Sequence, residues 1–289
     1  MYKAEVIVLA GGTGDLGRYL HEELIKDGRY SVALLTRKVP TGPTQIQPNQ
    51  PLTQPTKTES SSLPSTTTHK TDYSESSILS VLTLTRATAL ISLIRCPDEL
   101  YLPIHTNLLN ACLKSPTCKR FIPSEWAGNI DDFPDLPRSY RDTRGPLREL
   151  LKRTSPELKW TLFNFGWFME YFLPESKSYM KFLPGEFPID PVSWTYCAKG
   201  NGEALQSWTY RPLKRVYRDA TYIAASIEKY EKTGENDSEY VPEIEEWTVT
   251  GATACPREKT LRQYEKYFSS LRFLTIEEML EKAEAEGHV

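Results

Sequence analysis

The chain has 289 residues, a hydrophobic fraction of 39% and a formal net charge of −3. That length and composition suit one large α/β domain, or a main domain with a smaller second one. The slightly negative net charge gives no sign of the positively charged surface that binds nucleic acid. No apolar run approaches the roughly 18 residues that a membrane span requires, and the first apolar run leads into a glycine motif rather than a signal cleavage site. We therefore expect a cytoplasmic protein without a nucleic-acid or membrane partner.

Five cysteines and four histidines are scattered along the chain, without a C-x-x-C pair. Structural zinc sites need closely spaced ligands, and disulfide frameworks are typical of short secreted chains. We expect neither a metal site nor a disulfide framework. Reduced thiols suit the cytoplasm.

The N-terminal stretch VLAGGTGDLGRYL, Val8 to Leu20, joins a short apolar run to a helical pattern through three glycines. The apolar run predicts a buried strand over Ala4–Ala10, and leucines at a spacing of four predict a helix over Asp15–Lys26. A second strand is expected over Tyr30–Lys38, YSVALLTRK. The chain therefore begins with a strand, a glycine-rich turn, a helix and a strand.

The segment Val39 to Thr71 is rich in Pro, Thr, Ser and Gln. Such a composition cannot bury enough apolar surface to offset its ordering entropy. We interpret residues 39–71 as a long, mostly disordered surface insertion. It falls where a third strand would be expected, so that strand is predicted to be degenerate or missing.

Alternation of helices and strands returns at Ser74. This alternation predicts the α/β class, with a doubly wound parallel sheet of the Rossmann type. The expected elements are a helix from Ser74, a strand over Ala87–Arg95, a helix over Pro97–Leu113, a strand ending near Ser124, a helix over Pro137–Arg153, and then a strand and a short aromatic helix in KWTLFNFGWFMEYF.

The pattern is looser beyond Leu173, where prolines punctuate the chain. A helix is expected over Tyr217–Lys232, a strand over Trp247–Thr250, and a closing helical stretch from Arg257. We therefore divide the chain into a nucleotide-binding Rossmann domain, residues 1–172, and a smaller substrate-binding region, residues 173–289, which is partly interleaved with it.

Gly12, Gly14 and Gly17 have the spacing G-x-G-x-x-G between the first strand and the first helix. In a dinucleotide-binding loop the first glycine permits the tight turn, the second lets the backbone approach a pyrophosphate, and the third allows close packing of helix and strand. The N–H groups and the dipole at the helix start then favour the phosphates. The alternative is a structural turn without a ligand.

The end of the second strand reads LLTRK, with Arg37 and Lys38 and no carboxylate. A site that selects NAD places Asp or Glu there to bind the ribose 2′-OH. An arginine can instead pair with a 2′-phosphate through two parallel N–H donors. We therefore expect NADP(H), the alternative being a solvated basic pair at a strand end.

Four segments together carry a resemblance to a known family: GGTGDLG, LLTRK, KRFIPSEWAGN and FNFGWFMEYF. They resemble the isoflavone reductase-like and NmrA-like family of atypical short-chain dehydrogenases, and RFIPSEW is similar to the R-F-x-P-S-E-F segment of that family. The aromatic segment is most similar to fungal members of secondary metabolism. The resemblance covers about Lys3 to Phe172, apart from the insertion. It implies a nicotinamide-binding Rossmann fold, and the family includes both NADPH-dependent reductases and NADP-binding regulators.

Ligands of doubly wound sheets bind at the carboxyl ends of the strands. The residues at those ends are our candidates, although each could instead be an ordinary loop, cap or core residue. The candidate cofactor-binding residues are Gly11, Gly12, Thr13, Gly14, Asp15, Leu16, Gly17, Arg37, Lys38, Ser92, Pro123, Ser124, Asn164 and Phe165, and the candidate substrate-binding residues are Glu125, Trp126, Trp167 and Phe168.

The expected catalytic stretch departs from the family. Reductases that it resembles carry a lysine in a K-x-x-V-R pattern after P-S-E-F, and the matching stretch SYRDTRGPLREL places Arg144 at that position. Arginine does not release its proton in proteins, so Arg144 could polarise a carbonyl group but could not shuttle a proton. Tyr140, four residues earlier, could donate one. We assign Tyr140 and Arg144 as candidate catalytic residues; the alternative is that both face solvent or cap a helix.

The first interpretation is an NADPH-dependent oxidoreductase that transfers a hydride to a small aromatic or polyketide-like metabolite. Two alternatives remain: an NmrA-like, NADP-sensing regulator without turnover, and a redox-neutral isomerase or dehydratase on the same fold. The missing lysine favours the regulator, and the aromatic segment favours an enzyme.

Overall fold

The structure is a computed structural model that describes residues 5–37, 64–173, 177–181, 189–190, 195–199, 214–235 and 241–285. The chain divides into two compact units. The first unit comprises Met1–Trp126 and Asp142–Phe163, and the second comprises Ala127–Arg141 and Asn164–Val289. The first unit thus ends nine residues before the boundary expected at residue 172, and it excludes a short internal segment.

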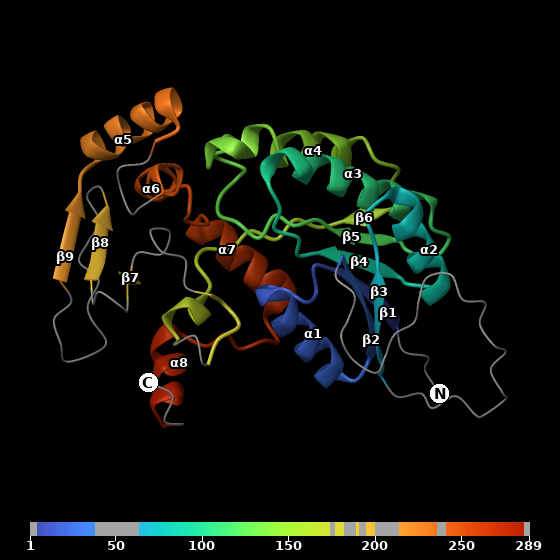
Figure 1. Ribbon diagram of the computed structural model, residues 1–289. Helices are drawn as coiled ribbons and strands as arrows, with labels where there is room; N and C mark the ends of the chain where they lie inside the picture. Colours follow the sequence, from blue (N-terminus) through green and yellow to red (C-terminus); the bar gives the residue numbers. More distant parts are fainter. Residues whose placement is uncertain are drawn as a thin grey trace, which may run out of the picture. The chain divides into compact units, whose positions relative to one another are not determined.

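The first unit is built on a parallel sheet, which confirms the predicted fold class (Figure 1). Every strand pair in this sheet is parallel, and the strand order among the described residues is β3-β2-β1-β4-β5-β6. This is the order of a Rossmann-type dinucleotide-binding sheet. The strands are β1 Glu5–Ala10, β2 Tyr30–Thr36, β3 Thr66–Lys70, β4 Ala89–Ser92, β5 Arg120–Ile122 and β6 Lys159–Trp160.

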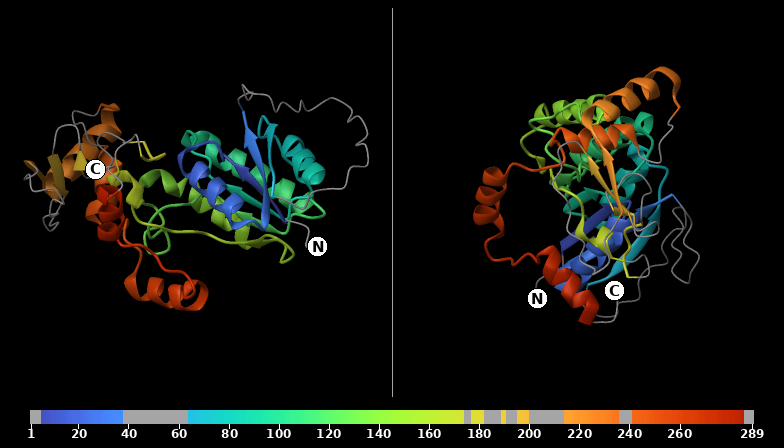
Figure 2. Two further views of the ribbon diagram at one scale, coloured as in Figure 1. Left: turned by 90° about the horizontal axis from the view of Figure 1, so that it is seen from below. Right: turned by 90° about the vertical axis from the view of Figure 1, so that its left-hand side faces the viewer.

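Helices cover both faces of this sheet (Figures 1 and 2). Helix α1, Asp15–Asp27, packs leucines against one face, and it ends at Gly28 in the left-handed conformation that favours glycine. Helices α2, Glu75–Thr85, α3, Asp98–Lys114, and α4, Arg144–Lys152, cover the other face. Because both faces are covered, the central strands are nearly continuous apolar runs.

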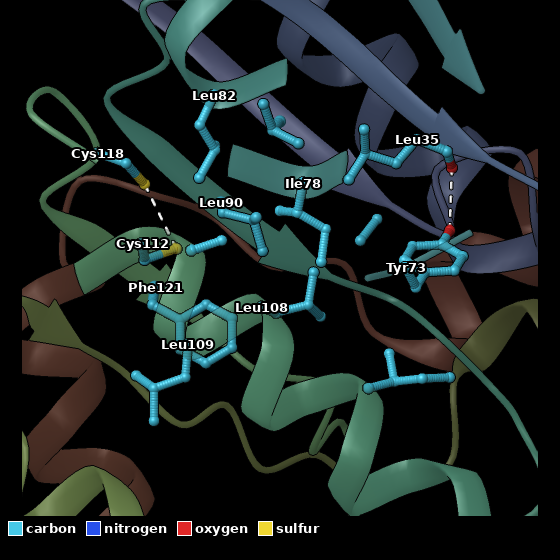
Figure 3. Close-up of a cluster of buried hydrophobic side chains, with 14 of the residues drawn as sticks. Leu35, Tyr73, Ile78, Leu82, Leu90, Leu108, Leu109, Cys112, Cys118 and Phe121 are labelled. Carbon is cyan, nitrogen blue, oxygen red and sulfur yellow. Dashed lines mark hydrogen bonds between the residues drawn. The ribbon is translucent and has the colours of Figure 1, made fainter. Parts of the chain in front are cut away.

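The larger core lies between the sheet and helices α2, α3 and α4. Phe121 of β5 and Leu108 of α3 are fully buried there, and the thiol of Cys118 contacts that of Cys112 at a sulfur–sulfur distance of 3.6 Å (Figure 3). The hydroxyl of Tyr73 closes one side of this core by donating a hydrogen bond to the carbonyl of Leu35 (Figure 3). This core therefore fixes the carboxyl ends of β2, β4 and β5.

The prediction that the third strand is degenerate or missing is wrong for residues 66–70. These residues form β3, which pairs with β2 from Val32↔Thr66 to Thr36↔Lys70. The strand is polar because it lies at the edge of the sheet, and its β-branched threonines suit a strand. The imidazole of His21 on α1 hydrogen bonds the Thr66 hydroxyl at 2.8 Å. The rest of the predicted insertion, up to residue 63, lies outside the described residues.

The other differences from expectation concern two segments of the second unit and one segment that crosses the boundary between the units. The predicted strand over Trp247–Thr250 is wrong, because Trp247 to Val249 end helix α6, Pro242–Val249, and Thr250 is its C-cap; the helix begins with a proline at its first position. The helix expected from Tyr217 begins later, as α5, Ala220–Thr233, with the Asp219 side chain as its N-cap. The helix expected over Pro137–Arg153 is divided into a 3₁₀ turn, η1 Arg138–Arg141, and α4.

The remaining elements of the second unit are short. A three-stranded sheet has the order β7-β8-β9, with β7 antiparallel to β8 and β8 parallel to β9. Within the described ranges, no helix is long and apolar enough to cross a membrane. The elements are η2 Met169–Phe172, β7 Ile189–Asp190, β8 Thr195–Lys199, β9 Lys214–Arg218, α7 Arg257–Gln263, the π-helical turn η3 Tyr264–Phe268 and α8 Ile276–Ala285.

Candidate functional site

The glycine loop, residues 11–17, joins β1 to α1. A Cβ atom at Gly17 would lie 2.6 Å from the backbone oxygen of Gly11, and one at Gly12 would lie 2.7 Å from a Leu34 methyl group and 2.8 Å from the Leu9 Cβ. All three distances are shorter than atoms tolerate. Gly12 therefore has to be a glycine for the loop to lie against Leu9 and Leu34, and Gly17 has to be a glycine for helix α1 to lie against the loop backbone.

Gly14 is different, because it is exposed and a side chain there would meet few atoms. A Cβ atom there would contact the Gly11 oxygen at 3.3 Å, with no other heavy atom within 4 Å. Gly14 is the N-cap of α1 and has an extended backbone. The first N–H groups of a helix have no acceptor within the helix. The loop thus presents an open backbone surface at a helix N-terminus, the arrangement that binds phosphate.

Arg37 follows β2 and is exposed, with its guanidinium carbon 5.7 Å from the centre of the Tyr73 ring. Three contacts hold Tyr73 itself. Its hydroxyl donates to Leu35 O at 3.2 Å, its N–H donates to the Thr71 hydroxyl at 2.9 Å, and its carbonyl accepts from the Asn107 amide at 3.0 Å. Tyr73 has a φ of 62°, which is strained for a bulky residue. Lys38, the other predicted phosphate-binding cation, lies outside the described residues.

A buried set of hydrogen bonds, the sheet-edge network, joins the ends of β4 and β5 to α3. Its members are Ser92, Tyr101, His105 and Ser124. The Ser92 hydroxyl lies 3.0 Å from His105 Nε2, and Nε2 also accepts from the Ser124 N–H at 3.4 Å. The Tyr101 hydroxyl donates to Ser124 O at 2.8 Å, and the Ser124 hydroxyl donates to Ile94 O at 3.0 Å.

His105 is the centre of this network and is neutral. Its Nδ1 lies 2.9 Å from the carbonyl of Tyr101, so Nδ1 carries the proton and Nε2 is the acceptor. Burial and, to a smaller extent, the Arg144 charge lower the pKa of His105 to about 4, although its hydrogen bond with the Tyr101 carbonyl acts in the opposite direction. The imidazole also stacks on the Tyr101 ring with centroids 4.0 Å apart. The network therefore fixes two strand ends without carrying a charge.

The two residues after Ser124 are held inside the first unit. Both carboxylate oxygens of Glu125 accept from the guanidinium of Arg148, at 2.7 and 2.6 Å, and the Glu125 side chain is fully buried. The Trp126 indole donates to Ser92 O at 2.7 Å and stacks on Phe163. Glu125 was predicted to bind substrate, and the structure gives its carboxylate an internal ion pair.

Arg144, at the start of α4, lies against α3. Its guanidinium carbon is 4.1 Å from the centre of the Tyr101 ring, and one of its nitrogens is 3.2 Å from the Thr143 hydroxyl and 3.9 Å from an Asp98 carboxylate oxygen. Tyr101 also belongs to the sheet-edge network. The Tyr101 side chain therefore connects Arg144 to the end of β5.

The aromatic cluster of the second unit joins three segments that are distant in the sequence. Trp247 of α6 lies between Tyr140 of η1 and Trp167, with ring centroids 6.5 and 6.3 Å away. The ring of Trp167 meets that of Tyr171 edge-on at 5.9 Å. Further members are Phe165 and Phe168, whose ring centroids are 6.0 Å apart.

Two side-chain polar atoms in the described part of the second unit are buried without a hydrogen-bond partner. They are the indole nitrogen of Trp247 and the side-chain nitrogen of Asn164. Asn164 precedes Phe165 and forms an isolated parallel bridge with Ala127. Both atoms are donors, so this unit offers buried N–H groups that its own described residues do not use.

The sequence thus located much of both regions but not the residues that connect them. Ser92, Ser124 and Trp126 converge in the first unit, where Tyr101, His105 and Arg148 were missed. Tyr140, Phe165, Trp167 and Phe168 converge in the second unit, where Trp247 was missed. In the stretch SYRDTRGPLREL, Leu147-Arg148 stands where the family pattern K-x-x-V-R has V-R, and this match could have identified Arg148. Trp247 was missed because its segment was predicted to be a strand. Tyr140 and Arg144 are not on one continuous helix and belong to different units.

The strand order and the glycine loop define a dinucleotide-binding protein of the Rossmann class. Comparison with solved structures agrees on the fold. Leucoanthocyanidin reductase from Vitis vinifera, solved as a complex with NADPH, superposes with a TM-score of 0.61 at 13% identity, over 96% of this chain and 98% of that one. A nucleoside-diphosphate-sugar epimerase from Staphylococcus aureus gives a TM-score of 0.55 at 15% identity, over 95% and 99%.

Curated sequences give the family. The oxidoreductase SwnR of Metarhizium robertsii is 30% identical over 94% of this chain and 96% of its own length, and SwnR of Arthroderma benhamiae is 29% identical over the same shares. No family model matches the chain. The chain belongs to the isoflavone reductase-like, NmrA-like family of oxidoreductases, together with the fungal SwnR proteins.

Proposed function

We propose that this protein is an NADPH-dependent oxidoreductase whose substrate is a small aromatic or polyketide-like carbonyl compound. Membership of the oxidoreductase family supports the reaction class. The leucoanthocyanidin reductase that shares its fold was solved with NADPH, which supports the cofactor. The aromatic cluster supports a planar substrate.

The observation that carries the proposal is a difference among the glycines of the glycine loop: two positions have no room for a side chain, and a third is exposed. Gly12 and Gly17 have no room for a side chain, because Leu9, Leu34 and the loop backbone lie against them, whereas a Cβ atom at Gly14 would meet only the Gly11 oxygen, at 3.3 Å. A structural turn needs the first feature only. The open backbone at Gly14, at the N-terminus of a 13-residue helix, fits a pyrophosphate. Residues 11–17 would hold the cofactor phosphates.

Arg37 would select the phosphorylated cofactor. Its exposed guanidinium follows the end of β2, and no carboxylate lies in the strand end LLT that precedes it. A 2′-phosphate bears close to two negative charges near neutral pH, whereas the 2′-OH of NADH bears none. Arg37 therefore stabilises bound NADPH and leaves NADH almost unaffected. Ser92, Pro123, Ser124, Asn164 and Phe165 remain our candidates for the rest of the cofactor surface.

NADPH supplies a hydride when it is bound. The chain must then stabilise negative charge on a substrate oxygen and supply a proton to it. Arg144 can provide positive charge but cannot release a proton, so we assign the proton to the hydroxyl of Tyr140. The aromatic cluster orients the substrate and excludes water from it.

Calorimetric titration with NADPH and NADH tests the cofactor assignment. We expect the wild type to bind NADPH about 30-fold more tightly, a difference of roughly 2 kcal/mol for a charge-assisted contact. Arg37→Ala should remove most of this difference by weakening NADPH alone, and Arg37→Asp should reverse the preference. Arg153→Ala, which removes an exposed arginine at the end of α4, is the matched control. Equal affinities in the wild type would refute the assignment.

Turnover is tested separately, by following the absorbance of reduced nicotinamide with a panel of aromatic ketones and enones. Oxidation of NADPH by one of them is the expected result. Tight NADPH binding without oxidation would indicate an NADP-sensing regulator. Conversion of a panel member with no net oxidation of the cofactor would indicate an isomerase or a dehydratase.

A further inference from the structure

Trp247 has a buried indole N–H group that nothing in the described part of the chain accepts. Buried tryptophans almost always find a hydrogen-bond acceptor, because desolvating an unpaired donor costs free energy. An unpaired donor in a native structure therefore needs an explanation. A ligand that supplies the missing acceptor is one.

The position of Trp247 is tightly fixed by its neighbours on α6. Glu246 accepts from the guanidinium of Arg138 at 2.7 and 2.8 Å. Glu245 is buried and accepts from Arg218 at 2.6 and 2.8 Å. Two adjacent bidentate ion pairs therefore anchor α6 just before Trp247. Such anchoring holds the indole ready for a ligand without further ordering.

The same ion pair explains why Tyr140 lies beside Trp247. Arg138 belongs to η1, so its contact with Glu246 brings that turn against α6. Tyr140, two residues after Arg138, then lies beside Trp247, and the centroids of the two rings are 6.5 Å apart. The residue that we assign as proton donor and the unpaired indole therefore belong to one aromatic cluster.

The chemistry of the cluster limits the ligand. An indole N–H only donates a hydrogen bond. The ligand must therefore offer an acceptor. The donor is not charged, so a neutral carbonyl oxygen suffices. The rings of Tyr140 and Trp167 on either side of Trp247 favour a planar, apolar group next to that oxygen.

We infer that Trp247 is a substrate-binding residue whose indole N–H donates a hydrogen bond to the carbonyl oxygen of a planar conjugated ligand, which packs on the rings of the aromatic cluster. The inference rests on the proposed function only in treating that ligand as the hydride acceptor. It does not depend on the identity of the cofactor.

The test uses the full chain, labelled with ¹⁵N, and follows the indole N–H resonances. The probe is 4-phenylbut-3-en-2-one, a planar enone, and the matched hydrocarbon is 1-phenylpropene, which lacks the carbonyl group. Trp247→Phe identifies the resonance of Trp247. We expect its proton to move downfield when the enone is added, and not when the hydrocarbon is added.

Affinities of the variants provide the second measurement. Trp247→Phe keeps an aromatic ring and loses the donor, so enone binding should weaken about five-fold while hydrocarbon binding stays unchanged. Trp160→Phe, at an exposed tryptophan of β6, is the matched control and should leave both affinities unchanged. If Trp247→Phe does not fold, the resonance shift in the wild type still decides, with Trp247 identified by elimination through single replacement of the other tryptophans.

Three results would overturn the inference: a Trp247 resonance that stays fixed at saturating enone, equal enone affinity in Trp247→Phe, or no enone binding at all. Failure of the proposed function has a different signature. A protein that shifts its Trp247 resonance with the enone but does not bind NADPH would retain this inference and lose the proposed function.

Discussion

The sheet-edge network of the first unit and the aromatic cluster of the second are both assembled from distant parts of the chain, but they use their polar atoms differently. In the network, the hydroxyls of Ser92 and Ser124 and both nitrogens of His105 have partners. In the second unit, no acceptor among the described residues pairs with the side-chain N–H groups of Trp247 and Asn164; the first unit also has two such buried atoms, Thr117 Oγ1 and Arg144 Nε, but neither belongs to the network. A satisfied network fixes backbone and needs no ligand. Unused donors indicate where a ligand completes the structure.

The largest expected effect follows when a buried charge in the first unit loses its partner. Arg148→Met leaves the fully buried carboxylate of Glu125 without its partner. We expect the free energy of unfolding in urea to fall by about 4 kcal/mol. The double variant Glu125→Leu, Arg148→Met should recover most of that loss, because it removes both charges. A single variant as stable as the wild type would show that the Glu125–Arg148 pair is dispensable.

The neutrality of His105 predicts how stability depends on pH. Its pKa is about 4 in the folded protein and near 6.5 in the unfolded chain. The unfolded chain therefore binds more protons between these values, so stability falls as the pH is lowered from about 6.5 to about 4. The expected loss from this residue is about 3 kcal/mol.

The checks are an NMR titration of His105 and the pH dependence of urea unfolding. His105→Gln removes the titrating group, and we expect it to flatten the dependence over this range, whatever it does to stability at neutral pH. A ring that titrates near 6.5 would contradict the buried, neutral role.

The glycine loop sharpens the comparison, because a side chain would clash at Gly17 but would meet only one atom at Gly14. Gly17→Ala places a methyl group against backbone atoms at 2.6 Å, so it should lower stability by about 2 kcal/mol. Gly14→Ala meets only one atom, at 3.3 Å, so it should leave stability nearly unchanged and weaken NADPH about tenfold or more. Thermal unfolding and calorimetry separate the two effects. A Gly14 variant with wild-type NADPH affinity would exclude this position from the binding surface.

The smallest expected effect concerns Tyr73, whose ring lies beneath Arg37. Tyr73→Leu removes a cation–π contact that orients the guanidinium, so NADPH should bind about three-fold more weakly and NADH unchanged. Tyr73→Phe keeps the ring and should keep the NADPH preference. If Tyr73→Leu weakens both cofactors equally, the tyrosine supports the loop and has no part in selectivity.

The first unit was predictable where local pattern and tertiary structure agree. Strands β1, β2 and β4 are nearly continuous apolar runs, and the glycine spacing identified the turn and the start of α1. Strand β3, TTTHK, escaped prediction because an edge strand buries little, and its identity comes from pairing with β2. Composition alone could not separate those residues from the polar segment before them.

The second unit was harder, because its elements depend on contacts between distant residues. Trp247 and Val249 lie in a short stretch that favours a strand locally, yet the ion pairs of Glu245 and Glu246 hold it as helix α6. Phe165, Trp167 and Phe168 were recognised from the sequence as candidate binding residues. Their partner Trp247 was not, since nothing local links α6 to residues so far away in the chain.

The division of the chain at Trp126, Arg141 and Phe163 has a consequence for recombination between relatives. Neither unit is a continuous stretch, so no single crossover in a gene exchanges one unit intact. A chimera that keeps the glycine loop and replaces the aromatic cluster must take two inserts, residues 127–141 and 164–289, and must keep α4 from the parent. A single fusion point therefore cannot exchange either unit as a whole.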